Sequence, residues 1–194
     1  GRSSFTGSGT VNRFWTAIRI LSKLRTLTGF EGGAQRREMN QEVVDVDEPI
    51  QQLLIIGIGE QKFAIFGHYL REILSDPDVC WVPGCPDSIE GVINLRGRIE
   101  SVIRLHERLR TGMPSTELSA GFVLIAETEE IRTGIRIEAL IDMIEISESE
   151  LQPPPSSLPI HMQPYVSHVM TYQQQPLAVL NIQRLLADYT KELA

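Results

Sequence analysis

Short apolar runs separated by turn residues dominate the chain from residue 50 onward. Residues 52–58 and 61–66 are two such runs on either side of Gly59-Glu60, which predicts a hairpin with a two-residue turn. Further strands are expected at 92–95, 98–103, 122–127, 131–137, 140–146, 166–170 and 177–180. Nine or ten short strands at this spacing indicate a β-barrel or a β-sandwich.

Short helical segments interrupt these strands. Residues 68–74 and 105–109 each predict one or two turns of helix. Asn181 is the expected N-cap of a last helix. The apolar residues of this helix recur at helical spacing and are Ile182, Leu185, Leu186 and Tyr189. Residues 153–155 are three prolines, which predict an extended loop because proline cannot donate to a sheet ladder.

Residues 1–48 differ in composition from the rest and predict a flexible arm. Within it, residues 11–28 combine apolar positions at helical spacing with four basic residues and no acidic one, which is typical of a basic amphipathic helix. The apolar positions are Phe14, Trp15, Ile18, Leu21 and Leu24, and the basic ones are Arg13, Arg19, Lys23 and Arg25. Four alternatives stay open: the helix binds an anionic membrane surface, binds a partner's groove, docks on its own domain, or is vector-derived sequence.

Length and charge narrow the class of protein. A chain of 194 residues fits one domain of upper-middle size or two small halves. The net charge of −7 argues against a nucleic-acid-binding protein, which needs clustered Lys and Arg. Nowhere do eighteen apolar residues run together, and the start of the chain lacks the apolar core of a secretory signal, so we expect a cytoplasmic protein.

Residues that could carry catalysis or bind metal are sparse. Cys80 and Cys85 are expected to be free thiols in a reducing compartment, since a zinc pair would need further ligands elsewhere. The four histidines show no metal-like spacing, and no G-x-S-x-G segment occurs. The G-x-G at residues 57–59 precedes a predicted strand, where a phosphate site would need a helix. We therefore expect no enzyme, no cofactor and no metal.

The segment 81–99 carries most of the information in the chain. Pro83, Gly84 and Pro86 predict a rigid corner. The apolar strand 92–95 follows, Arg96-Gly97 breaks it, and residues 98–103 resume with branched side chains. Two strands joined by a tight turn are expected, forming a recognition surface without catalytic chemistry.

This segment resembles the CheW family of bacterial chemotaxis adaptors. The family has P-G-x-P followed closely by G-(V/I)-x-N-L-R-G, and the matching residues are Pro83, Gly84, Pro86, Gly91, Asn94, Leu95, Arg96 and Gly97. The resemblance extends over about residues 52–186. It implies a mainly β fold of two packed, SH3-like, five-stranded β-barrels with a few short helices in a domain spanning 49–194. We expect the first barrel at about 50–112 plus the C-terminal segment, and the second at about 120–180.

The resemblance also implies a function. It implies that this chain is a non-enzymatic scaffold that couples a methyl-accepting-type receptor to a two-component histidine kinase. The kinase's regulatory domain would contact barrel ends, and a receptor helical hairpin would lie in the groove between barrels. Two alternatives stay open: a pilus-motility or phototaxis paralogue serving another kinase, and an enzyme whose site is built from the acidic loops. The acidic residues of these loops are expected simply to form a face in contact with solvent. They are Glu127, Glu129, Glu130, Glu145, Glu148 and Glu150.

The residues expected to bind partners are Leu70, Glu72, Gly91, Asn94, Leu95, Arg96 and Gly97. Arg96 follows an apolar strand and is expected to be partly buried, where a guanidinium needs a carboxylate partner. Glu72 is the candidate, because residues 70–73 match the V-x-E-(I/V) pattern of the family's first-half helix apart from Leu for Val. Whether the pair only locks the fold or contacts a partner stays open.

The chain departs from the family pattern at three further positions. The family usually reads V-(V/I)-P-V-(I/V)-D-L-R after L-R-G-x, whereas Ser101 replaces the proline and Arg104 the aspartate. Glu138 replaces the aspartate of G-(L/I)-x-V-D. The charge reversal at Arg104 leaves the identity of the partner open.

Overall fold

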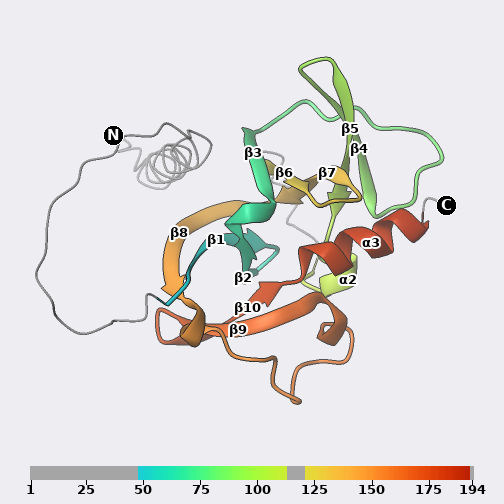
Figure 1. Cartoon of the computed structure of the whole chain (residues 1–194). Helices are drawn as coiled ribbons and strands as arrows, with labels where there is room; N and C mark the ends of the chain where they lie inside the picture. Colours follow the sequence, from blue (N-terminus) through green and yellow to red (C-terminus); the bar gives the residue numbers. More distant parts are fainter. Residues whose placement is uncertain (1–47, 113–120, 193–194) are drawn as a thin grey trace, which may run out of the picture.

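The computed structural model describes residues 48–112 and 121–192 (Figure 1). Its strands form two five-stranded sheets, in the orders β8-β1-β2-β10-β9 and β3-β6-β7-β5-β4. The strands are β1 (Ile50–Ile58), β2 (Gln61–Phe66), β3 (Leu70–Ser75), β4 (Ile89–Leu95), β5 (Arg98–Arg104), β6 (Phe122–Glu127), β7 (Arg132–Ile137), β8 (Ala139–Ser147), β9 (Val166–Tyr172) and β10 (Gln175–Leu180). The mainly β fold is confirmed.

Each sheet closes into a small barrel through one extra bridge between its edges. Cys80, in the segment after β3, pairs with Val92 of β4 through two backbone hydrogen bonds of 2.8 and 2.9 Å. Gln152, after β8, pairs with Val169 of β9 in the same way. We call the β8-β1-β2-β10-β9 sheet barrel A and the β3-β6-β7-β5-β4 sheet barrel B. The expectation of two packed five-stranded barrels is confirmed.

Strand β1 shows why the barrels pack so closely. Its alternate residues Leu53 and Ile55 fill the core of barrel A, while Leu54, Ile56 and Ile58 join a larger core that it shares with barrel B. A strand buried on both faces reads as a continuous apolar run, which is what this part of the sequence is. The hydrophobic effect therefore stabilises the pairing of the barrels as well as each barrel.

The strands are divided between the barrels differently from the expected split into about 50–112 plus the C-terminal segment and about 120–180. Barrel B contains all of β3 to β7, and barrel A combines β1 and β2 with β8 to β10. The chain crosses between barrels twice, at η1 (Gly67–Tyr69) and at Glu138. The parallel pairs β10–β2 and β5–β7 bring distant strands together, and no local sequence pattern records such pairing.

The helix expected at 68–74 is wrong beyond its first turn. Only Gly67–Tyr69 is helical, as a 3-10 turn, and Leu70–Ser75 is strand β3, paired with β6. The register shifts between Leu70 and Glu72, so a β-bulge adds one residue there. The bulge places the buried Leu70 and Ile73 three residues apart, which imitates the spacing of a helix.

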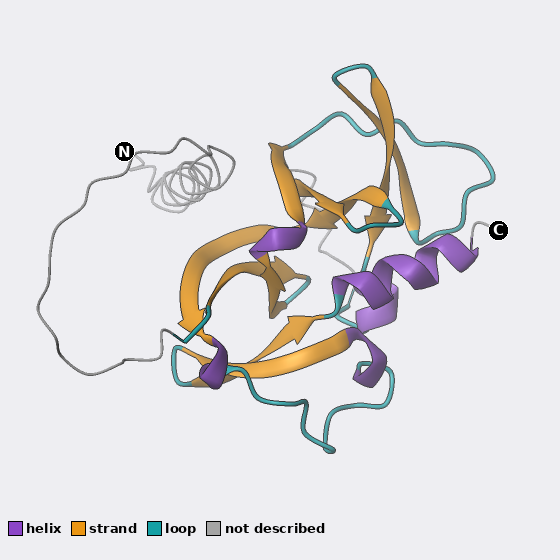
Figure 2. Ribbon diagram, in the orientation of Figure 1, coloured by secondary structure: helices purple, strands orange, loops and turns teal. Residues whose placement is uncertain are grey.

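The other helices lie around the two sheets and at their junction (Figure 2). They are α2 (His106–Leu109), η2 (Glu148–Glu150), η3 (Gln163–Tyr165) and α3 (Ile182–Glu192). Helix α3 buries the four apolar residues predicted for it in the shared core, and Asn181 Oδ1 accepts a hydrogen bond from Arg184 N at 3.0 Å. The expected N-cap is therefore confirmed. Among the described helices, none is long and apolar enough to cross a membrane.

Helix α3 is also held to α2 and β5 by polar contacts. The Tyr189 hydroxyl donates to the carbonyl oxygen of Arg104, and the Arg108 guanidinium lies 4.4 Å from the centre of the Tyr189 ring. Burial raises the pKa of Tyr189 to about 12, so the hydroxyl keeps its proton and remains a donor. The arm expected at 1–48, with its helix at 11–28, lies almost wholly outside the described residues.

Candidate partner-binding surface

The β4–β5 hairpin ends in a two-residue turn whose geometry is set by Asn94, Arg96 and Gly97. Arg96 and Gly97 have φ of 53° and 84°, the combination of a type I′ turn. Asn94 Oδ1 accepts a hydrogen bond from Gly97 N at 2.9 Å and so holds the turn. The hairpin extends beyond the rest of its sheet (Figure 1), which leaves its tip open to a partner.

Arg96 pairs with Glu72 as the sequence predicts. Its Nη2 lies 2.9 Å from Glu72 Oε1, joining the hairpin tip to β3 on the opposite edge of the sheet. The expectation that Arg96 is partly buried is wrong, because its side chain is 80% exposed while that of Glu72 is 26% exposed. A turn residue at the end of a projecting hairpin has no neighbouring strand to cover it.

The structure separates the seven candidate residues into two groups. Leu70 is buried in the shared core. Gly91 is buried where β4 meets the segment after β3, and a β-carbon on it would lie 2.3 Å from the carbonyl oxygen of Cys80. These two residues therefore maintain the barrel. The other five are half-buried or exposed and lie together at the hairpin and on β3: Glu72, Asn94, Leu95, Arg96 and Gly97.

Sequence reasoning missed Ile99, which lies directly opposite Asn94 in the hairpin and is 67% exposed. Strand β5 alternates Ile99, Ser101 and Ile103 on one face, but β7 pairs only with Val102 to Arg104. Ile99 thus lies past the point where β7 covers the sheet. An isoleucine at the turn end of a strand is the signal that could have found it.

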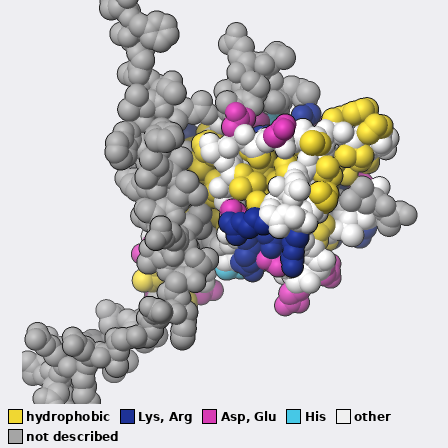
Figure 3. Space-filling model, turned by 90° about the horizontal axis from the view of Figure 1, so that it is seen from above, with side chains coloured by type: hydrophobic (Ala, Val, Ile, Leu, Met, Phe, Trp, Pro, Cys, Tyr) yellow, Lys and Arg dark blue, Asp and Glu magenta, His cyan; other side chains and the backbone are white. Residues whose placement is uncertain are grey.

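We define the tip surface as Glu72, Asn94, Leu95, Arg96, Gly97 and Ile99. Two ion pairs involve residues next to its members in sequence: Arg71 lies 2.7 Å from Glu127, and Glu100 lies 3.1 Å from Arg132. Figure 3 shows a face on which hydrophobic side chains gather beside a group of Lys and Arg. The tip surface can therefore offer apolar contact and oriented charges together, which suits protein recognition.

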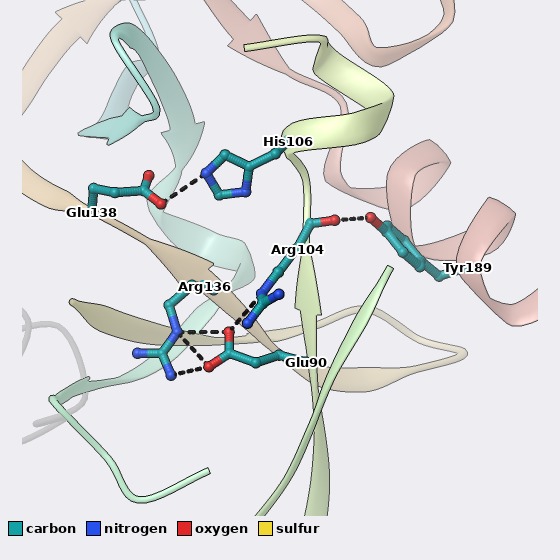
Figure 4. A network of polar contacts seen from close by, with 6 residues as sticks. All are labelled: Glu90, Arg104, His106, Arg136, Glu138 and Tyr189. Carbon is teal, nitrogen blue, oxygen red and sulfur yellow. Dashed lines mark hydrogen bonds and ion pairs between the residues drawn. The ribbon is translucent and has the colours of Figure 1, made fainter. Parts of the chain in front are cut away.

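The charge reversal at Arg104 is balanced inside the chain. Arg104 Nε lies 3.3 Å from Glu90 Oε2, and Arg136 Nε lies 3.1 and 2.8 Å from the two oxygens of the same carboxylate (Figure 4). Burial raises the pKa of Glu90, but the hydrogen bonds and charges of Arg136 and Arg104 outweigh it and lower the pKa below its ordinary value. Arg104 therefore has a counter-charge within the chain.

The described parts of the chain hold no cluster of metal-ligating side chains. No three side chains of His, Cys, Asp or Glu come together there as metal ligands, and Cys80 and Cys85 are free thiols. A groove of about 390 Å³ does include two of the acidic loop residues, Glu129 and Glu130. Its one hydroxyl, that of Thr128, is bonded to the backbone of Ile131, so no activated nucleophile faces the groove.

Two packed barrels with a projecting apolar and charged hairpin tip define a protein-interaction module. The family model of the CheW-like domain matches residues 52–190, and the chain belongs to this family. This chain is a non-enzymatic adaptor of chemotaxis-type signal transduction, which couples receptors to a histidine kinase.

Individual relatives agree with this assignment. The chain is 31% identical over 146 residues to the chemotaxis protein CheW of Treponema pallidum, covering 73% of this chain and 84% of that protein. It is 29% identical over 100 residues to the chemotaxis protein CheW of Thermotoga maritima, covering 52% and 65%. The crystal structure of the scaffolding protein TtCheW from Thermoanaerobacter tengcongensis superposes with a TM-score of 0.60 at 23% identity, covering 68% and 88%, and shows the shared fold.

Proposed function

We propose that the tip surface, rather than the groove between the barrels that the resemblance implies, is where this adaptor contacts the receptor's cytoplasmic helical hairpin, while barrel ends contact the regulatory domain of the kinase. The observation that supports the first contact is the exposure of Ile99 beside the Arg96–Glu72 pair. A helical hairpin presents apolar residues flanked by polar ones along one face, so it can cover the isoleucine and meet both charges. The adaptor then works in the cytoplasm, where both partner segments lie.

The test compares two isoleucines of equal exposure. Ile99 and Ile50 are each 67% exposed, but Ile50 begins β1 in barrel A, away from the tip surface. Ile99→Asp should weaken binding of a receptor hairpin fragment at least tenfold, or about 1.4 kcal/mol. Ile50→Asp should change this binding less than about twofold. Calorimetric titrations with the receptor fragment and, separately, with the kinase regulatory domain give both affinities. If the two variants weakened binding of the receptor fragment equally, the receptor contact would be refuted.

Which cellular response this adaptor serves is a separate question. A paralogue of pilus motility or phototaxis would bind a different kinase through the same two barrels. Pull-down of the full chain from native lysate, with identification of the kinase by mass spectrometry, separates these alternatives from swimming chemotaxis. Recovery of a kinase with a CheW-like regulatory domain is the expected result.

We also propose that residues 11–28 bind peripherally to the membrane surface. Their four basic side chains each contribute about 1 kcal/mol near anionic headgroups, and Phe14 and Trp15 can insert shallowly. Sedimentation with anionic liposomes compares the full chain with a shortened chain that starts at Pro49. Only the full chain should sediment, and equal, negligible binding of both would remove the membrane contact.

A further inference from the structure

Residues 151–183 contain no Asp, Glu, Lys or Arg, although 22% of the whole chain is charged. The stretch is not hidden inside the fold, because many of its side chains, among them Ile160 and Gln173, are exposed. Exposed segments normally carry charges, since charged side chains are almost never fully buried. A surface without charges instead has the composition of the centre of a protein interface, where charged residues are depleted.

Within this stretch, the loop between η2 and η3 holds Ile160 firmly in solvent. Met162 N donates to Pro159 O at 2.8 Å and closes a turn with Ile160 inside it. Gln163 Nε2 donates to Leu158 O at 3.0 Å across the same turn. Met162 is buried in the shared core and Leu158 packs against that core, so both ends of the turn are fixed. Ile160 is nevertheless 84% exposed.

A groove of about 520 Å³ lies beside this turn, and Met162 forms part of its wall. The groove lies where β2 and β10 separate, because the two strands are paired only at residues 63–64 and 178–179 and not nearer their starts. Phe63 and Leu177, which are 1% and 5% exposed, also line it. Apolar core side chains therefore reach the surface at the bottom of the groove.

The polar side chains of the groove carry no net charge. Three of them are glutamines, and the other two are one acid and one base. They are Gln61, Gln173, Gln175, Glu60 and Lys62. A glutamine amide both donates and accepts hydrogen bonds, so it can pair with the same amide on another molecule. We call the groove together with residues 159–162 the neutral face.

The charge of the chain favours a second copy as the occupant of the neutral face. Each chain has a net charge of −7, so two copies repel one another over most of their surfaces. This repulsion is smallest where the surface has no net charge. The face also places a projecting isoleucine next to a groove, and a two-fold interface needs such a self-complementary patch. Each copy can then insert Ile160 and receive that of the other.

We propose that this chain forms a two-fold dimer through the neutral face. Ile160 of each copy lies in the groove of the other copy and covers the apolar side chains at its bottom, including Leu177. The β4–β5 hairpin lies at the other end of the molecule from the loop that carries Ile160 (Figure 1). The tip surfaces of both copies therefore remain uncovered in the dimer.

Sedimentation velocity of the full chain between about 1 and 100 μM tests this dimer, and the mass should rise from one chain to two. Ile160→Asp places a charge in each groove and should weaken dimerisation at least tenfold. Because Ile160 is 84% exposed, the variant should fold like the unchanged chain, which circular dichroism checks. The matched control is Ile99→Asp, the same change at an exposed isoleucine of barrel B, and it should leave dimerisation unchanged.

A full chain that remains a monomer at about 100 μM would overturn the dimer. Equal weakening by Ile160→Asp and Ile99→Asp would overturn the neutral face as the interface, and assemblies larger than two chains would overturn the two-fold arrangement. The measurement contains neither receptor nor kinase, so the dimer and the proposed partner contacts can fail separately.

Discussion

Arg96 is held by Glu72 yet remains almost fully in water, so its charge should matter more for binding than for folding. Exposed ion pairs contribute only about 0–1 kcal/mol to stability because solvent screens them. Arg96→Ala should therefore lower the free energy of unfolding by less than about 1 kcal/mol while weakening the receptor contact. Urea unfolding combined with calorimetric binding measures both; a stability loss above about 2 kcal/mol would assign Arg96 a mainly structural role.

Glu90 provides the contrasting case of a carboxylate that is needed inside the fold. Glu90→Gln leaves the guanidinium of Arg136, which is 14% exposed, without its charged partner. Removing one member of a buried pair costs on the order of 3 kcal/mol. The same substitution at the more exposed Glu72 is the control and should cost under about 1 kcal/mol. Equal losses in urea unfolding would show that burial does not set the importance of these carboxylates.

Single residues also show where sequence reasoning about the site succeeds. The Arg96–Glu72 contact could be predicted, because a carboxylate partner was expected for Arg96 and the family pattern that residues 70–73 match pointed to Glu72. The exposure of Arg96 could not, because it depends on how far the hairpin projects from its sheet. Asn94 has a structural role that the sequence did not indicate, because its Oδ1 accepts a hydrogen bond from Gly97 N and holds the turn.

Closure of barrel B depends on Gly91, which lies in the edge strand β4. A β-carbon at this position would meet Cys80 O at 2.3 Å, so Gly91→Ala must displace the Cys80–Val92 bridge. Gly97→Ala is the matched control, since nothing lies within 4 Å of its added carbon and only left-handed strain of about 1 kcal/mol results. Gly91→Ala should lose more stability than this control in urea unfolding. A smaller loss would mean that the bridge is dispensable.

Helix α3 should depend measurably on its N-cap. Asn181→Ala removes the acceptor for Arg184 N and should cost about 1 kcal/mol. Asn181→Asp keeps an acceptor and should retain most of the stability, as followed by thermal denaturation. If alanine and aspartate behaved alike, the apolar face of the helix alone would fix its start.

The contrast between α3 and β3 explains which elements could be predicted. The cap and the apolar spacing of α3 are local, so the sequence contains them in full. In β3 a bulge at Arg71 makes a strand look like a helix, and only pairing with β6 reveals it. The two-barrel fold came from family resemblance, while the division of strands depends on crossovers that no segment shows by itself.

For the molecule as a whole, Glu90 and Glu138 predict loss of stability in acid. Both carboxyls have pKa values lowered below the ordinary 4.5 on folding. A lowered folded-state pKa contributes stability that is complete above the unfolded value and is lost as the pH falls through the folded value. The free energy of unfolding should therefore decline below about pH 4.5.

Urea unfolding at pH 3 to 6 measures this decline. Glu90→Gln should be less stable at pH 6 but should lose less on acidification, because one of the two titrating groups is gone. Parallel pH curves for the two proteins would show that Glu90 does not take part in the acid transition.

The double crossing of the chain between barrels has a consequence for biosynthesis. β1 and β2 leave the ribosome early, but β8, which pairs with β1, follows only after about seventy more residues. At about 5–20 residues per second, this interval lasts roughly 4–14 s. All strands of barrel B are synthesised within this interval, so barrel B can fold first. Until β8 follows, the apolar surface of β1 and β2 stays uncovered. A chaperone should therefore engage the nascent chain at β1 and β2 before barrel A can close.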